Sequence, residues 1–201
     1  MNPLRFLSRR SLLTTGVAAA SGLVMAGKSA FSATAQNLKP TPSCHDGDEP
    51  TLPEIEGPYF KPRSPKRSDL REGVNGRPAE LSGFVLTRSC RPIAGALIDL
   101  WHADDNGDYD NQGFRLRGHV FTDASGRYAF QTIVPGLYPG RTRHYHVKVQ
   151  VPRRPLLTTQ FYFPDEPFNP KDEYFHPELV MKVEPTEDAL QARFDVVLAM
   201  R

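Results

Sequence analysis

The segment RHYHVKVQV, residues 143–151, alternates polar and apolar side chains with a period of two. Successive side chains of a β-strand point to opposite faces, so the alternation predicts a strand over residues 144–151. One face would carry His144, His146, Lys148 and Gln150, and the other Val147, Val149 and Val151. The histidine face is then either solvated or part of a metal site. Two histidines alone do not decide this, because zinc and iron sites need more than two ligands.

Short segments of the same kind recur along the chain. The 19 prolines and 15 glycines break it into short pieces. Long segments with a helical period are absent, and only residues 186–192 are expected to form a short turn of helix. Runs typical of strands occupy residues 81–87, 96–102, 118–122, 127–133, 144–151, 158–163 and 194–199. DASG, residues 123–126, predicts a hairpin turn between the third and fourth runs. Short strands at this spacing predict an all-β fold, an antiparallel β-sandwich.

Residues 1–35 are expected to be an export signal. Arg9 and Arg10 precede an apolar, Ala-rich run over residues 12–26, and residues 33–35, Ala-Thr-Ala, offer a cleavage site. The run is too short and too rich in small residues for a stable membrane span. The arginine pair followed by Ser-Leu-Leu resembles a twin-arginine signal, which predicts a periplasmic or extracellular bacterial protein. About 166 residues would remain, as an extended arm over 36–80 and a sandwich domain over 81–201.

Charge and cysteine content limit the partners and the compartment. A net charge of +2, part of which leaves with the signal, argues against nucleic acid as the main partner. Cys44 and Cys90 would lie in an oxidising compartment, where one disulfide and two free thiols both stay open. The number of subunits is not readable either, so a homo-oligomer stays open.

Two tyrosines lie in irregular segments near the histidine strand. Tyr109 is in the polar segment 102–118, and Tyr138 is in the segment 134–143, with Gly and Pro residues on both sides. Taken singly, each could simply pack over an end of the sandwich. Only five residues separate Tyr138 from His144, however, so that phenol and imidazole must lie in one neighbourhood. A neutral phenol is a poor ligand for a weakly acidic divalent ion, whereas Fe(III) can displace its proton.

A longer pattern resembles a known family. LSGFVLTRSCRPIAGALIDLWHADDNGDYDN from residue 81, followed by RGHVFTDASGRYAFQTIVPGLYPGR from residue 117, is similar to the core of the intradiol ring-cleavage dioxygenases, the family of protocatechuate 3,4-dioxygenase and the catechol 1,2-dioxygenases. The resemblance extends over roughly residues 53–199. The matching elements are Gly83, the Pro92–Gly95 turn, Asp99-Leu100-Trp101, Gly107-x-Tyr109, Arg117-Gly118, Thr122-Asp123, Gly126-x-Tyr128-x-Phe130-x-Thr132-Ile133, Pro135-Gly136, Tyr138-Pro139, His144-x-His146, EGPYF at 56–60 and QFYF at 160–163.

The resemblance implies an enzyme, its cofactor and its site. One Fe(III) per chain would be bound by Tyr138 and His144 as the axial pair, by Tyr109 and His146 as the equatorial pair, and by a hydroxide or water. Arg141 matches an arginine that faces the substrate and stabilises negative charge, and Gln160 and Tyr59 match residues that line the pocket. The implied reaction cleaves a catechol with O2 between its hydroxylated carbons, giving a cis,cis-muconate-type diacid. Tyr138 would take a proton from the catechol.

Two departures put the substrate in question, and two other classes have to be weighed. YPGRTRH, residues 138–144, is shorter than the family pattern, which predicts a more open pocket, and export is unusual for members that act on aromatics inside the cell. Arg143 and Lys148 would weakly favour a carboxylated ring. A transthyretin-like binding module would explain the first two strands but not the joint presence of two tyrosines and two histidines. A cupin-like Fe(II) dioxygenase would need carboxylate and histidine ligands in a pattern that the chain lacks.

Overall fold

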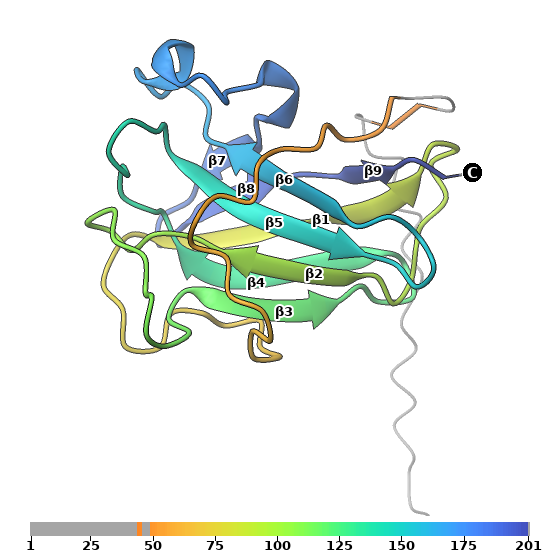
Figure 1. The fold of residues 1–201 in the computed structure, drawn as a ribbon, viewed down its shortest axis with the longest axis horizontal. Coiled ribbons are helices and arrows are strands. Elements are labelled where there is room, and N and C mark those ends of the chain that lie inside the picture. Colours follow the sequence, from red (N-terminus) through yellow and green to blue (C-terminus); the bar gives the residue numbers. More distant parts are fainter. Residues whose placement is uncertain (1–43, 46–48, 201) are drawn as a thin grey trace, which may run out of the picture. The chain divides into compact units, whose positions relative to one another are not determined.

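The computed structural model describes residues 44–45 and 49–200, so the predicted export signal lies outside the described residues. This part of the chain forms two β-sheets that pack face to face, with no α-helix in the described ranges (Figure 1). The elements are β1 (Pro78–Thr87), β2 (Leu97–Trp101), β3 (Arg117–Phe121), β4 (Arg127–Ile133), β5 (His144–Gln150), β6 (Leu157–Tyr162), the 3-10 helices η1 (Asn169–Lys171) and η2 (Pro177–Leu179), β7 (Lys182–Pro185), β8 (Leu190–Arg193) and β9 (Val196–Leu198). None of the described helices has the length and apolar character that crossing a membrane requires.

The two sheets confirm the predicted sandwich, although β1 has two parallel neighbours. One sheet has the order β3-β2-β5-β6 and is antiparallel throughout. The other has the order β4-β1-β8-β7, with β9 also on β1. In this second sheet β1 pairs antiparallel with β4 but parallel with β8 and β9. Apolar side chains from the inner faces form the core, among them Leu81, Val85, Ile98, Leu100, Phe130, Tyr145, Val147, Val149 and Phe161.

The C-terminal part of the β1 sheet differs from the prediction. Residues 194–199 contain only the short strand β9, because Phe194 and Asp195 interrupt the ladder between β8 and β9. The backbone N–H of Phe194 donates to the Ser82 carbonyl, 3.0 Å away. The Phe194 carbonyl oxygen would lie 1.7 Å from a Cβ on Gly83, so only glycine allows this approach of the two strands.

Two further predictions about local structure were wrong. Residues 186–192 form no helix, because a turn closed by Thr186 and Ala189 leads into β8, which pairs with both β1 and β7. DASG does form a turn, in which the Asp123 carboxylate accepts the backbone N–H groups of Ser125 and Arg127. It is not a hairpin, since β3 pairs with β2 and β4 pairs with β1. The turn therefore passes the chain from one sheet to the other.

The arm that precedes β1 crosses the outer face of the β3-β2-β5-β6 sheet (Figure 1, orange). The backbone N–H of Glu54 donates to the Thr158 carbonyl at 2.8 Å, and the Gln160 amide donates to the Ile55 carbonyl at 3.1 Å. As a result, the polar face of β5 is covered, and only Gln150 at the end of the strand is exposed. A disulfide joins Cys44, at the start of the described arm, to Cys90 in the turn after β1.

Candidate metal centre

His144 and His146 form the centre of the site on the outer face of β5. Their Nε2 atoms are 3.1 Å apart, and their rings are inclined at 81°. Both residues are buried, with 5% and 3% of their surface exposed. Two imidazole nitrogens that bind one ion at roughly 2.0–2.1 Å come about this close to each other. The spacing of the two nitrogens is therefore that of a pair of ligands to a common ion.

The protonation states of the two histidines suit metal binding. His144 Nδ1 lies 2.6 Å from the Thr142 carbonyl oxygen, which can only accept, so Nδ1 carries the proton and Nε2 keeps its lone pair. Burial, reinforced by the charge of Arg141, lowers the pKa of His144 to about 4. Burial and the neighbouring His144 lower the pKa of His146 well below its ordinary value. Both imidazoles are therefore neutral at physiological pH, which is the form that binds metals.

His146 is buried in an aromatic environment. Its ring stacks on Trp101, with centroids 5.0 Å apart and an interplanar angle of 6°. Its Nδ1 is buried and has no hydrogen-bond partner among the described residues. A Cβ on Gly57 of the arm would lie 3.2 Å from His146 Cε1, so the arm backbone closes directly over this ring.

Tyr109 and Tyr138 come together because their loops touch through backbone atoms. The Gly136 N–H donates to the Asp104 carbonyl at 2.6 Å. A Cβ on Gly107 would lie 2.2 Å from the Leu137 carbonyl oxygen, so a side chain there would push the loops apart. The two phenol rings are inclined at 78°, with centroids 5.9 Å apart, and the Tyr109 ring lies 6.0 Å from that of His146. Glycine at the crossing point is thus what allows these phenols to meet the histidines.

The arm adds a third phenol, Tyr59. Its ring stacks on Tyr109 at 4.4 Å and 16°, and its hydroxyl lies 2.8 Å from the Tyr138 hydroxyl. The hydrogen bond to Tyr138 raises the pKa of Tyr59, and burial raises the pKa of Tyr109 above its ordinary value. Both phenols therefore stay protonated at neutral pH unless a bound cation lowers their pKa.

Arg117 connects this phenol of the arm to the Tyr109 loop. It is 1% exposed, and its Nη1 donates to the Tyr59 carbonyl at 2.6 Å. Its Nε and Nη2 donate to the Asp110 carbonyl at 3.2 and 3.0 Å. The sequence pattern includes Arg117 but gives no sign of this role, because both carbonyls belong to segments without regular structure.

Arg141 and Gln160 lie together, and Gln160 pairs with His146 across β5 and β6. Arg141 Nη2 donates to Gln160 Oε1 at 2.6 Å. Arg141 Nε donates to both carboxylate oxygens of Asp172, at 3.0 and 2.9 Å. Sequence reasoning missed Asp172, which is buried and also accepts the Thr142 N–H at 2.8 Å. Nothing in NPKDEYF, residues 169–175, signals a partner 31 residues away.

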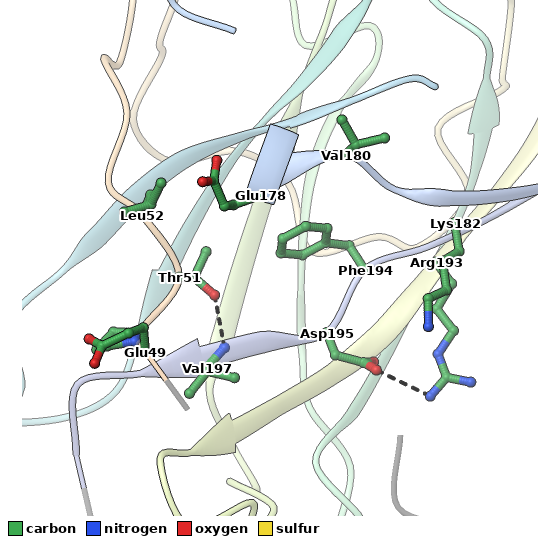
Figure 2. Close-up of a pocket in the computed structure, with 11 residues that line it drawn as sticks. Glu49, Thr51, Leu52, Glu178, Val180, Lys182, Arg193, Phe194, Asp195 and Val197 are labelled. Atoms are coloured by element: carbon green, nitrogen blue, oxygen red, sulfur yellow. Dashed lines mark hydrogen bonds and ion pairs between the residues drawn. The ribbon is translucent and has the colours of Figure 1, made fainter. Parts of the chain in front are cut away.

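For an ion bound by the two histidines, the phenol oxygens of Tyr109 and Tyr138 are the further ligands that lie close by. In the ranges 44–45 and 49–200, no group of three or more His, Cys, Asp or Glu side chains lies together as a metal site. A cavity of about 480 Å³ is elsewhere, between residues 49–52 of the arm and residues 193–197 (Figure 2). It shares no residue with the tyrosine–histidine cluster.

Comparison with known proteins identifies the family. A family model described as Dioxygenase matches residues 55–200. The chain belongs to the intradiol ring-cleavage dioxygenase family. Enzymes of this family use iron, and two neutral imidazoles facing each other beside two phenols fit such an ion.

Three relatives give the extent of the likeness. The dioxygenase domain of a dioxygenase–carbohydrate-binding protein fusion from Streptomyces sp. SirexAA-E is 51% identical, with a TM-score of 0.74 over 76% of this chain and 100% of that one. Hydroxyquinol 1,2-dioxygenase from Pseudomonas putida DLL-E4 is 25% identical, with a TM-score of 0.68 over 76% of this chain and 67% of that one. Chlorocatechol 1,2-dioxygenase from Pseudomonas sp. strain P51 is 31% identical over 55% of each chain. The chain thus spans about half the length of the curated relatives it matches.

Proposed function

We propose that this protein is a non-haem Fe(III) intradiol dioxygenase. It would cleave the ring of a catechol-type substrate with O2 between the two hydroxylated carbons, giving a cis,cis-muconate-type diacid. The observation that carries the proposal is the convergence of four side chains, in which the Nε2 atoms of His144 and His146 lie 3.1 Å apart with Tyr109 and Tyr138 beside them. Relatives that act on catechol, chlorocatechol and hydroxyquinol support a catechol-type substrate.

One Fe(III) per chain would be held by Nε2 of His144 and His146 and by the phenol oxygens of Tyr109 and Tyr138. When bound, the ion would take up the two oxygens of the catechol and make its ring reactive toward O2. Tyr138 would take a proton from the incoming catechol at its phenol oxygen, because the bound ion would already have displaced the proton of that phenol. The Tyr59 hydroxyl, 2.8 Å from the same oxygen, supports this role as a hydrogen-bond partner.

Arg141 would act on the substrate without binding the ion. Its guanidinium is held by Asp172 and Gln160, and its side chain remains 13% exposed. A guanidinium is always charged, so it can stabilise negative charge that develops on the ring oxygen during cleavage. Gln160 keeps the guanidinium oriented, and its own amide is fixed by the Ile55 carbonyl of the arm.

Purified protein expressed with sufficient iron tests the proposal directly. We expect about one iron per chain, a red to burgundy colour from tyrosinate-to-iron charge transfer, and O2 uptake with catechol that yields a muconate-type product. Tyr109→Phe or Tyr138→Phe should shift or weaken the visible band. Tyr145→Phe is a matched control, because the Tyr145 hydroxyl donates to the Ile133 carbonyl in the core instead. Colourless protein that contains zinc would favour the alternative, a transthyretin-like module that binds ligands without catalysis.

We also propose that the protein is exported in the folded state. The arginine pair at residues 9 and 10 motivates this, and the Cys44–Cys90 disulfide supports an oxidising compartment. Replacing Arg9 and Arg10 by lysine should leave folded, coloured protein in the cytoplasm, since iron would be loaded before transport. Export of the double variant at the wild-type level would contradict the twin-arginine route.

A further inference from the structure

The six cations in the chain segments that carry the proposed iron centre are engaged by other protein groups. We infer that the substrate pocket selects catechols without a ring carboxylate, an inference that rests on the proposed function. The chain segments that carry the centre, residues 59–61, 109–117 and 138–148, contain six cations: Lys61, Arg115, Arg117, Arg141, Arg143 and Lys148. A carboxylated ring would need at least one of these to be available.

Arg141, the cation placed to face the substrate, is neutralised by a buried carboxylate. Its Nε lies 2.9 Å from Asp172 Oδ2, and the Asp172 side chain is 0% exposed. Asp172 also accepts the backbone N–H groups of Thr142 and Tyr174, so it cannot move away without breaking them. Arg141 Nη2 is used by Gln160. The guanidinium can therefore stabilise negative charge that develops during the reaction. Its own positive charge in the resting protein is already matched by the Asp172 carboxylate.

Arg143 and Lys148, which the sequence associates with a carboxylated ring, are paired as well. Arg143 Nε donates to Glu166 at 2.7 Å, and its Nη1 donates to the Pro135 carbonyl. Lys148 forms an ion pair with Glu56 of the arm and lies 3.7 Å from the centroid of the Phe60 ring. Neither is a free cation, because the arm and the loop after β6 supply a carboxylate to each.

The remaining cations are also occupied. Arg115 lies 3.7 Å from the Asp110 carboxylate. Arg117 is buried and donates only to backbone carbonyls in the described contacts, and Lys61 donates to the carbonyls of Asn111 and Gly113. Three further carboxylates, those of Asp104, Asp105 and Asp108, lie on the same loop as Tyr109.

A ring carboxylate entering this site would lose hydration, and each of the six cations would have to give up a protein partner to bind it. Burying an unpaired carboxylate is strongly unfavourable. A methyl, halogen or hydroxyl substituent at the same ring position meets neither cost. The rings of Tyr59 and Tyr109, which stack on each other beside His146, offer aromatic surface that suits such neutral rings. The specificity-determining groups are thus the carboxylates that match the cations, Asp172 first among them.

Three substituted catechols separate charge from size: 4-methylcatechol, 3,4-dihydroxybenzoate and its methyl ester. The ester is larger than the acid, so a preference for the ester over the acid reflects charge. We expect iron-loaded wild-type protein to cleave the acid with a kcat/KM at least about 100-fold below that of the ester. Dissociation constants, measured without O2 from the change in the visible spectrum, should differ in the same direction.

The variant Asp172→Asn tests the source of the selectivity. It keeps the shape of the side chain but leaves the charge of Arg141 unmatched, so the ratio of acid to ester turnover should rise about tenfold even if overall activity falls. Asp69→Asn is the matched control, because Asp69 also pairs with an arginine, Arg71, but is exposed and pairs with β4 at Gln131. Glu166→Gln, which leaves Arg143 unmatched, is a second variant in case Asp172→Asn does not fold.

The outcomes are distinguishable. Cleavage of the acid by wild-type protein within about tenfold of the ester would overturn the inference and leave the proposed function intact. An acid-to-ester ratio that is the same in Asp172→Asn, Glu166→Gln and wild type would also overturn it. Failure of the iron-loaded protein to cleave any of the three compounds would overturn the proposed function, and the inference with it.

Discussion

The phenol oxygens of Tyr59 and Tyr138 lie 2.8 Å apart, so a residue of the N-terminal arm is hydrogen-bonded to a proposed iron ligand 79 positions later. The arm is fixed at this point because Arg117 holds the Tyr59 carbonyl. A segment without regular structure therefore completes the site, and its removal would expose the histidine face of β5.

Tyr59→Phe should weaken catalysis without removing the metal. The ring would keep its stack on Tyr109, and only the hydrogen bond to Tyr138 would be lost. One hydrogen bond of this kind is worth about 1 kcal/mol, so we expect about a fivefold loss in kcat with iron retained and the visible band shifted. Tyr145→Phe serves as the control. An unchanged band together with unchanged kcat would show that Tyr59 plays no part in the site.

Arg141→Ala and Arg143→Ala should affect different properties. Arg141→Ala should keep iron and colour but lose about 10²–10³-fold in turnover, the usual effect of removing one transition-state charge partner. Arg143→Ala should lose far less turnover, because its partners are Glu166 and the Pro135 carbonyl rather than groups beside the histidines. Single-turnover kinetics at saturating catechol measures both. Equal small losses, or a larger loss for Arg143→Ala, would contradict these assignments.

Gly107→Ala should lower both stability and iron content. The new methyl group would lie 2.2 Å from the Leu137 carbonyl, and forcing the two tyrosine loops apart should cost about 1–3 kcal/mol. Gly140→Ala is the matched control, since Gly140 also has a positive φ, of 80°, but no atom lies within 4 Å of its Cβ position. Iron per chain and the thermal midpoint should fall more for Gly107→Ala. Equal changes in the two variants would show that the crossing of the loops is not a tight contact.

His102 makes the protein sensitive to acid. Burial lowers the pKa of His102 to about 4, from an ordinary value of 6.5, while its ring is hydrogen-bonded to the Ala103 carbonyl and to Thr132. Between these pH values the unfolded chain binds a proton that the folded protein does not. The free energy of unfolding should therefore fall as the pH is lowered from 6.5 toward 4, by about 3 kcal/mol from this residue.

Urea unfolding of iron-free protein between pH 7.5 and 4.5 measures this effect. His144 and His146 also have lowered pKa values and add to the slope, so the comparison is between wild type and His102→Gln. The variant should show a shallower dependence on pH. Identical slopes would mean that folding does not lower the pKa of His102.

Removing the Cys44–Cys90 disulfide should destabilise the fold. The bridge closes a loop with a sequence separation of 46, and loss of such a crosslink typically costs about 2–4 kcal/mol. Because reductants would also reduce the iron, the double variant Cys44→Ser/Cys90→Ser is the cleaner comparison. Thiol labelling of denatured wild-type protein should find no reactive cysteine before reduction. Full labelling without reductant would rule out the bridge.

The local pattern of the chain determined the strands and part of the centre. The alternation in residues 144–150 places two histidines on one face by the geometry of a single strand, and five residues keep Tyr138 close to them. The family resemblance also selected Tyr109, Arg141 and Gln160, which the fold brings to the same region. These features were readable because each depends on neighbours in sequence or on an ordered set of motifs.

The tertiary structure alone decided which segments cover the proposed iron centre and which carboxylates match the charges of its cations. The seating of Gly57 over His146, the pairing of Asp172 with Arg141 and the loop crossing at Gly107 all join residues far apart in the chain. The sheet-to-sheet turn at DASG and the short strand β8 were misjudged for the same reason. A local pattern shows which way a side chain points along its own strand. It does not show which other segment will lie against it, because that depends on the packing of the whole domain.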